Sequence, residues 1–188
     1  MTNSSRIVPA VALVAGIALA ATIVVAVGSL EAMSHEKPFG GAGDVAFAEK
    51  VWTGMDGYME WPMSSGVYPG TSPHGAFLRV YYNIVNVDGE PYHVIVKDNY
   101  GGEGVTETKV EKDPEKWLAA VTTMVQRETG YDPENNDWFW VKYGPDGTIM
   151  ENPKGMALAG RVAKGTDSGC IACHANAGGG DYVFTNDH

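Results

Sequence analysis

The sequence predicts a mainly β (α+β) domain, in which an antiparallel sheet has short flanking helices and follows an N-terminal hydrophobic helix. Three segments rich in aromatic and β-branched residues predict the sheet: 77–85, 92–98 and 138–143. Asp88-Gly89 separates the first two, and this dipeptide is typical of a tight turn between strands. The pattern therefore favours a sheet over a helical bundle as the centre of the domain.

The N-terminal helix is predicted from an uncharged apolar run over residues 7–30 that follows Arg6. As a helix this run would reach about 36 Å at about 1.5 Å per residue, and the hydrocarbon core of a membrane is about 30 Å thick. We therefore expect residues 1–30 to be a membrane anchor. The alternative is a long signal peptide cleaved near Ala26-Val27-Gly28. Either form directs export, so the rest of the chain is expected in the periplasm, anchored or soluble.

Residues 31–43 contain Pro, Ser and several Gly and are expected to be a linker, and residues 44–188 are expected to form one domain. Asp44 is a suitable cap for a first helix that runs to about Met59, and Pro62 ends it. Apolar residues recur in this helix at spacings of three to four and predict one buried face: Phe47, Val51, Met55 and Tyr58.

The second half of the chain alternates predicted strands and short helices. A short helix is expected over 115–120, and a strand over 121–126. Residues 148–150 are expected to pair back across a Pro-Asp-Gly turn. Small and apolar residues predict a helix over 156–164, and Asp167 is the expected cap of a last short helix.

The motif in that last helix is Cys170-Ile171-Ala172-Cys173-His174, and its two cysteines are the only ones in the chain. Two thiols at this spacing can add to the two vinyl groups of one haem, and the histidine then coordinates the iron. The alternative is a dithiol/disulfide motif, which usually opens a helix near the start of a thioredoxin-like domain. Here the motif lies close to the C-terminus and a histidine follows directly. The sequence therefore predicts one covalently bound haem c, packed against the sheet, with His174 as the iron ligand.

The charge distribution limits the choice of partners. The net charge is −10, and all 23 acidic residues lie after residue 30. Without a basic patch, nucleic acid is not an expected partner. An acidic surface favours a cationic redox partner through electrostatic steering. The alternative is a surface that is charged only for solubility.

Several further segments accompany the haem motif in a fixed order along the chain: 72–77 (SPHGAF), 95–100 (IVKDNY), 130–133 (GYDP), 137–140 (DWFW) and 181–184 (DYVF). With them, the sequence resembles the cytochrome P-460 and cytochrome c′-β family over about residues 61–184. The resemblance implies a mostly antiparallel sheet, a homodimer and a haem iron held by the proximal histidine only. It also implies an open distal face that binds small nitrogen compounds such as hydroxylamine or nitric oxide.

The resemblance also implies which residues would be catalytic. In the P-460 type a lysine is bonded to the haem macrocycle and the protein oxidises hydroxylamine, whereas the c′-β type lacks this bond and binds nitric oxide. Lys97 matches the cross-linking lysine, Arg79 matches a distal arginine, and Thr122 stands where the P-460 type has a distal carboxylate. The threonine weighs against hydroxylamine oxidation. Lys97 and Arg79 also have a plainer interpretation as charged residues on the exposed side of a strand.

The resulting functional prediction is an exported mono-haem cytochrome that oxidises hydroxylamine or nitric oxide. The alternatives are a non-enzymatic nitric-oxide-binding protein and an electron-transfer cytochrome. The sequence contains no recognisable methionine ligand motif, which weighs against the electron-transfer cytochrome. His74 lies in a Pro-Gly loop and is expected to be structural. His93 shares a strand face with Lys97, but the two are more than about 13 Å apart at about 3.3 Å per residue, so both cannot lie over one iron.

Overall fold

The computed structural model describes Met1 and residues 38–184. The predicted N-terminal helix over residues 7–30 lies outside these described residues. Within them, no helix is long and apolar enough to cross a membrane. The described residues from 38 onward belong to one folding unit.

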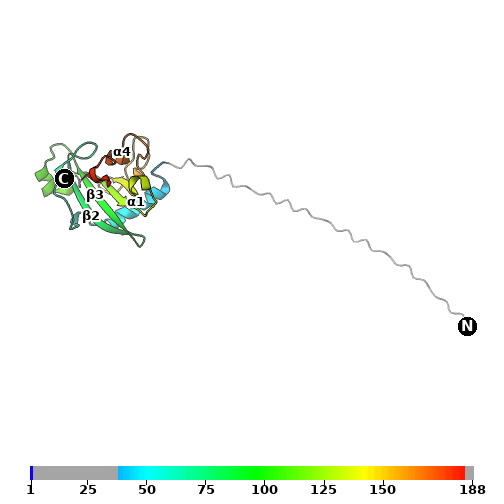
Figure 1. Ribbon diagram of the computed structural model, residues 1–188. Helices are drawn as coiled ribbons and strands as arrows, with labels where there is room; N and C mark the ends of the chain where they lie inside the picture. The colour runs from blue at the N-terminus through cyan, green and yellow to red at the C-terminus, as the bar shows by residue number, and fades with distance from the viewer. Residues whose placement is uncertain (2–37, 185–188) are drawn as a thin grey trace. The chain divides into compact units, whose positions relative to one another are not determined.

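The predicted antiparallel sheet is confirmed, and β2 and β3 are labelled in Figure 1. Its six strands follow one another in chain order. The strands are β1 (Tyr68–Pro69), β2 (Phe77–Val87), β3 (Glu90–Tyr100), β4 (Leu118–Gln126), β5 (Trp138–Tyr143) and β6 (Ala159–Gly160). The turn between β2 and β3 is also confirmed, with Asp88 at φ 56° and Gly89 at φ 93°. Two positive φ values suit the twist of a tight hairpin, which explains the Asp-Gly dipeptide.

The helices are short, and most lie between strands or at the ends of the described chain. They are α1 (Ala42–Gly54), α2 (Glu107–Lys112), α3 (Pro114–Trp117), α4 (Cys170–His174) and the 3-10 turns η1 (Tyr58–Glu60), η2 (Pro133–Asn135) and η3 (Gly178–Gly180). The first helix ends before the expected Met59 because Gly57 adopts a left-handed φ of 69°. The predicted helix over 115–120 is likewise shorter, because the chain enters β4 at Leu118.

Two expectations for the C-terminal third are wrong. Residues 156–164 form no helix, because Ala159 and Gly160 pair with β5 as strand β6. Gly160 adopts a φ of +98°, and a Cβ there would lie 2.5 Å from the Asp44 carboxylate, so this position suits only glycine. Asp167 does not cap α4, whose N-cap residue is Gly169. The expected return pairing of residues 148–150 is confirmed by a bridge between Tyr143 and Ile149.

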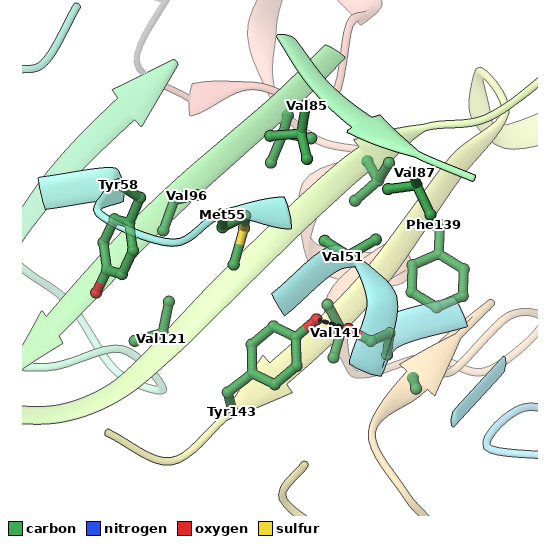
Figure 2. Close-up of a cluster of buried hydrophobic side chains, with 14 of the residues drawn as sticks. Val51, Met55, Tyr58, Val85, Val87, Val96, Val121, Phe139, Val141 and Tyr143 are labelled. Atoms are coloured by element: carbon green, nitrogen blue, oxygen red, sulfur yellow. Dashed lines mark hydrogen bonds between the residues drawn. The ribbon is translucent and has the colours of Figure 1, made fainter. Parts of the chain in front are cut away.

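One face of the sheet is buried under α1 and η1 and forms the core (Figure 2). The predicted apolar face of the first helix is confirmed, since Val51, Met55 and Tyr58 are buried against the strands. Val96 and Val121 meet them from β3 and β4. Successive residues of a strand point to opposite faces, so the neighbours of these valines in the sequence point away from the core.

A buried carboxylate lies at one end of this core. Asp98 is 0% exposed and accepts hydrogen bonds from the hydroxyls of Tyr58 (2.7 Å) and Tyr100 (2.8 Å). Burial raises the pKa of Asp98 to about 6, although both tyrosine hydroxyls and the charge of Arg79 act in the opposite direction. Between about pH 4 and 6 the folded protein therefore holds a proton that the unfolded chain releases.

The stabilisation that this proton provides is present below about pH 4 and is lost as the pH rises to about 6. A difference of about two pKa units corresponds to about 3 kcal/mol. We expect the free energy of unfolding of the wild type, minus that of Asp98→Asn, to fall by about this amount across the window. Urea unfolding of the holoprotein at several pH values measures it, with the exposed Asp56→Asn as control. A difference that does not change with pH would contradict the assignment.

Candidate functional site

The face of the sheet opposite the core presents a row of paired residues, one from each of four strands. Lys97 of β3 lies between Val80 of β2 and Thr122 of β4, and Lys142 of β5 pairs with Thr122 on its other side. The Lys97 side chain is half-buried, and burial lowers the pKa of its amine. A lysine whose amine loses its proton more easily is a better nucleophile than a solvated one.

Helix α4 brings the C-x-x-C-H motif to this same face. Ile171 packs into an apolar cluster with Met124 and Trp140, which project from β4 and β5. His174 is 7% exposed, and its ring lies 4.8 Å from the Trp140 ring and 5.2 Å from the Phe184 ring, centroid to centroid. Ile171 therefore anchors the motif to the sheet and keeps the histidine buried away from solvent.

The histidine is prepared to bind a metal through one nitrogen. Nδ1 of His174 lies 2.7 Å from the backbone oxygen of Tyr182, and a carbonyl only accepts, so Nδ1 is the protonated nitrogen. The lone pair is then on Nε2, as in metal-binding histidines oriented by a carbonyl. Burial lowers the pKa of His174 to about 4; the Tyr182 bond opposes this and the charge of Lys97 adds to it. The ring is therefore neutral at physiological pH.

The other donors also suit a haem. Cys170 and Cys173 are free thiols, the first half-buried and the second exposed. Burial raises the pKa of the Cys170 thiol. On the same face, Nε1 of Trp140 is buried without a hydrogen-bond partner among the described residues. A buried donor without a partner is uncommon in folded proteins, and a polar edge of a bound group would satisfy it. The two thiols, the available imidazole nitrogen and the unpaired indole together fit a bound haem.

The structure brings two of the three predicted catalytic residues to this site. Lys97 and Thr122 are directly paired, and the Thr122 hydroxyl donates to the backbone oxygen of Lys97 (3.2 Å). Arg79 is not among them. It pairs with Asp98 in the sheet, so it faces the core side, where its guanidinium forms an ion pair with Glu111. The one-residue step between Asp98 and Lys97 separates Arg79 from the motif face.

Two residues for which the sequence predicted no functional role lie at the site. Nδ1 of His74 lies 2.9 Å from Oδ1 of Asn99, and the His74 ring centroid lies 6.1 Å from that of His174. Asn99 was not singled out at all. Its position two residues after Lys97 places both on one strand face, and this is the signal that would have identified it.

An antiparallel sheet with a C-x-x-C-H helix over its outer face, and with the histidine held as a neutral donor, defines a haem-binding protein. The family model described as Cytochrome P460 matches residues 56–185, which is more than half of the chain. This chain belongs to the cytochrome P460 family. Membership implies a haem cofactor and chemistry on small nitrogen compounds. Neither the comparison with curated proteins nor the comparison with solved structures gave a match.

Proposed function

We propose that this chain is an exported mono-haem c cytochrome that oxidises hydroxylamine or nitric oxide on the iron face opposite His174. The observation behind the proposal is the position of Lys97, half-buried on the same sheet face as the C-x-x-C-H motif. The charge of Lys97 also lowers the pKa of His174, which supports this placement. The haem supplies the redox chemistry when bound, and the protein supplies attachment, orientation and exclusion of water.

Three residues of α4 would hold the cofactor. Cys170 and Cys173 would each form a thioether, and His174 would bind the iron through Nε2. The Tyr182 carbonyl fixes the ring orientation and increases the basicity of the ligand. The apolar cluster around Ile171 and Trp140 keeps water away from this side.

Lys97 is the residue that would distinguish an enzyme from a binding protein. Its amine lies in a half-buried position with a lowered pKa. A neutral amine could attack a macrocycle carbon once an external oxidant has removed two electrons, with the hydrogen of that carbon and one amine hydrogen leaving as protons. Thr122 lies beside it and offers a hydroxyl where a carboxylate would serve as a base. General acid–base help typically contributes about 10²–10⁴-fold, so we expect slow turnover.

The second candidate is a protein that binds nitric oxide without turnover. Two observations favour it. Thr122 cannot relay protons as a carboxylate would, and much of the face is apolar, with Val80, Ile95 and Met124 around the lysine. An apolar pocket suits a small neutral ligand.

Location and partners belong to the same proposal. Residues 7–30 would anchor the protein in the cytoplasmic membrane or be cleaved after export, which leaves the haem domain in the periplasm in both cases. The acidic composition, with a sequence pI of about 4.8, suits a cationic redox partner that accepts the electrons. A homodimer is the expected assembly.

Peptide mapping of the native holoprotein, with an absorption spectrum, tests the proposal. An enzyme of the proposed type yields two peptides joined through haem, one with Lys97 and the other with Cys170 and Cys173, and a red-shifted spectrum. It also turns over hydroxylamine. An ordinary haem c spectrum, no Lys97 peptide and tight nitric oxide binding would decide for the binding protein.

A further inference from the structure

The residue that orients the proposed iron ligand has an unfavourable backbone conformation. Tyr182, whose carbonyl oxygen accepts the Nδ1 hydrogen bond of His174 (2.7 Å), adopts a φ of +68°. A bulky aromatic residue rarely adopts this left-handed conformation, and it persists only where the surrounding structure holds it. Strain of this kind is concentrated at functional sites. The contacts that hold Tyr182 in place are therefore expected to matter for His174.

The Tyr182 side chain is held by the loop between β4 and β5. Its hydroxyl lies 3.1 Å from Oδ1 of Asn135 and 3.2 Å from the backbone oxygen of Glu134, and both of these atoms are acceptors. Asn135 is 8% exposed, and its Nδ2 donates to the carboxylate of Asp132 (2.8 Å). Because that bond fixes the orientation of the amide, Oδ1 of Asn135 is left to accept from Tyr182.

Asp132 makes this loop a rigid support. It is 1% exposed, and its other carboxylate oxygen accepts from the Lys164 amine (2.5 Å). Its backbone oxygen accepts from the backbone nitrogens of Asn135 and Asp137 (both 2.9 Å). Its backbone nitrogen donates to the Asp137 carboxylate (2.7 Å). A buried carboxylate with these partners is costly to move, because a rearrangement would leave a buried charge unpaired.

The backbone just before the strained residue is held by the same loop and by the start of β5. Nε1 of Trp138 donates to the backbone oxygen of Asp181 (3.0 Å). Nδ2 of Asn136 donates to the backbone oxygen of Gly180 (2.6 Å). The Tyr182 carbonyl is therefore held towards the iron ligand by bonds to the main chain before it and by the bond to its own hydroxyl.

The donor strength of an iron-bound imidazole depends on the hydrogen bond at its other nitrogen. When Nδ1 donates to a carbonyl the ring becomes more basic, and a more basic ligand favours ferric over ferrous iron. We propose that Tyr182 and Asn135 are positioning residues that keep the reduction potential of the haem iron low, because they hold the Tyr182 carbonyl on His174. This inference rests on the proposed haem site and adds a control of its potential by residues that do not contact the iron.

Redox titration of the holoprotein, with resonance Raman spectra of its ferrous form, tests the proposal. Loss of an outer-shell partner typically costs about 10–100-fold in metal affinity. Tyr182→Phe removes only the hydroxyl, so we expect the lower limit: about a tenfold smaller preference for ferric iron, which is a rise of about 59 mV in potential. The iron–histidine stretching frequency should fall. Tyr131→Phe is the matched control and should keep both wild-type values, because this half-buried tyrosine lies in the same loop but packs against the core.

Asn135→Ala should raise the potential at least as much as Tyr182→Phe does. The double variant should raise it no more than Asn135→Ala alone, because both substitutions break the same chain of bonds. A merely structural role would lower the stability of these variants and leave their potentials at the wild-type value, and that result would overturn the proposal.

Proton exchange in the ferrous wild type provides a test that needs no variant. The Nδ1 proton of His174, followed by nuclear magnetic resonance, should exchange slowly with solvent because it is buried in the bond to Tyr182. Rapid exchange would overturn the proposal even if the variants do not fold. Covalent haem with unchanged potentials in the variants would refute this inference alone, whereas a wild type without covalent haem would refute the proposed function.

Discussion

Replacing Lys97 with alanine is expected to reduce hydroxylamine oxidation to the background rate and to return the absorption spectrum to that of an ordinary haem c. The amine of Lys97 is the proposed nucleophile on the motif face, with a pKa that burial lowers. Without it no bond from protein to macrocycle can form beyond the two thioethers. The measurement is steady-state oxidation of hydroxylamine by the purified holoprotein, together with its absorption spectrum.

Lys142→Ala is the matched control for this variant. Lys142 lies on the same face and in the same row, one strand beyond Thr122, so its loss changes the charge of the face by the same amount. We expect its spectrum to match the wild type. Lys97→Arg keeps the charge, but a guanidinium stays protonated and is no nucleophile, so it should resemble Lys97→Ala. Full activity in Lys97→Ala would exclude the lysine from the chemistry.

The double replacement Cys170→Ser/Cys173→Ser is expected to leave all of the haem extractable into acid-acetone, whereas the wild type retains it. No other cysteine exists in the chain, so no other thiol can form a thioether. His174 would remain as an iron ligand, because Tyr182 and the apolar cluster, rather than the thiols, orient its ring. The double variant should therefore still bind added haem, reversibly.

Thiol labelling of the denatured holoprotein checks this result independently. The wild type should bind no thiol reagent, because both sulfurs are consumed, and each single variant should keep its haem through one thioether. Ser168→Ala, close to the motif and without a thiol, is the control and should behave as the wild type. Haem that extracts from the correctly matured wild type would contradict covalent attachment.

The strands were predictable because their signal is local. Residues 138–143 alternate so that Trp138 and Trp140 share one face, and β5 has these bounds in the structure. The Asp88-Gly89 turn likewise depends on two backbone conformations that few other residue pairs adopt. The helix predicted over residues 156–164 was wrong for the opposite reason. Their small and apolar pattern also suits a helix, and only pairing with β5, made possible by Gly160, selects a strand.

The residues of the candidate site also differ in whether the sequence alone could predict them. The C-x-x-C-H motif is a contiguous pattern, so the sequence alone predicted Cys170, Cys173 and His174, and the match to a Cytochrome P460 family model confirmed the family. Arg79 could not be placed this way, because a shift of one residue along a strand reverses the face that a side chain occupies. Its pairing with Asp98 puts it on the core side.

The sequence by itself determined the antiparallel sheet, the haem motif and the family, because each of these depends on neighbouring residues. The tertiary structure alone decided that Lys97 and Thr122 lie on the motif face while Arg79 does not, and that His74 and Asn99 lie at the site. These facts depend on strand register and on contacts between residues up to a hundred positions apart. No local pattern contains that information, because the sheet and α4 must pack together before the contacts exist.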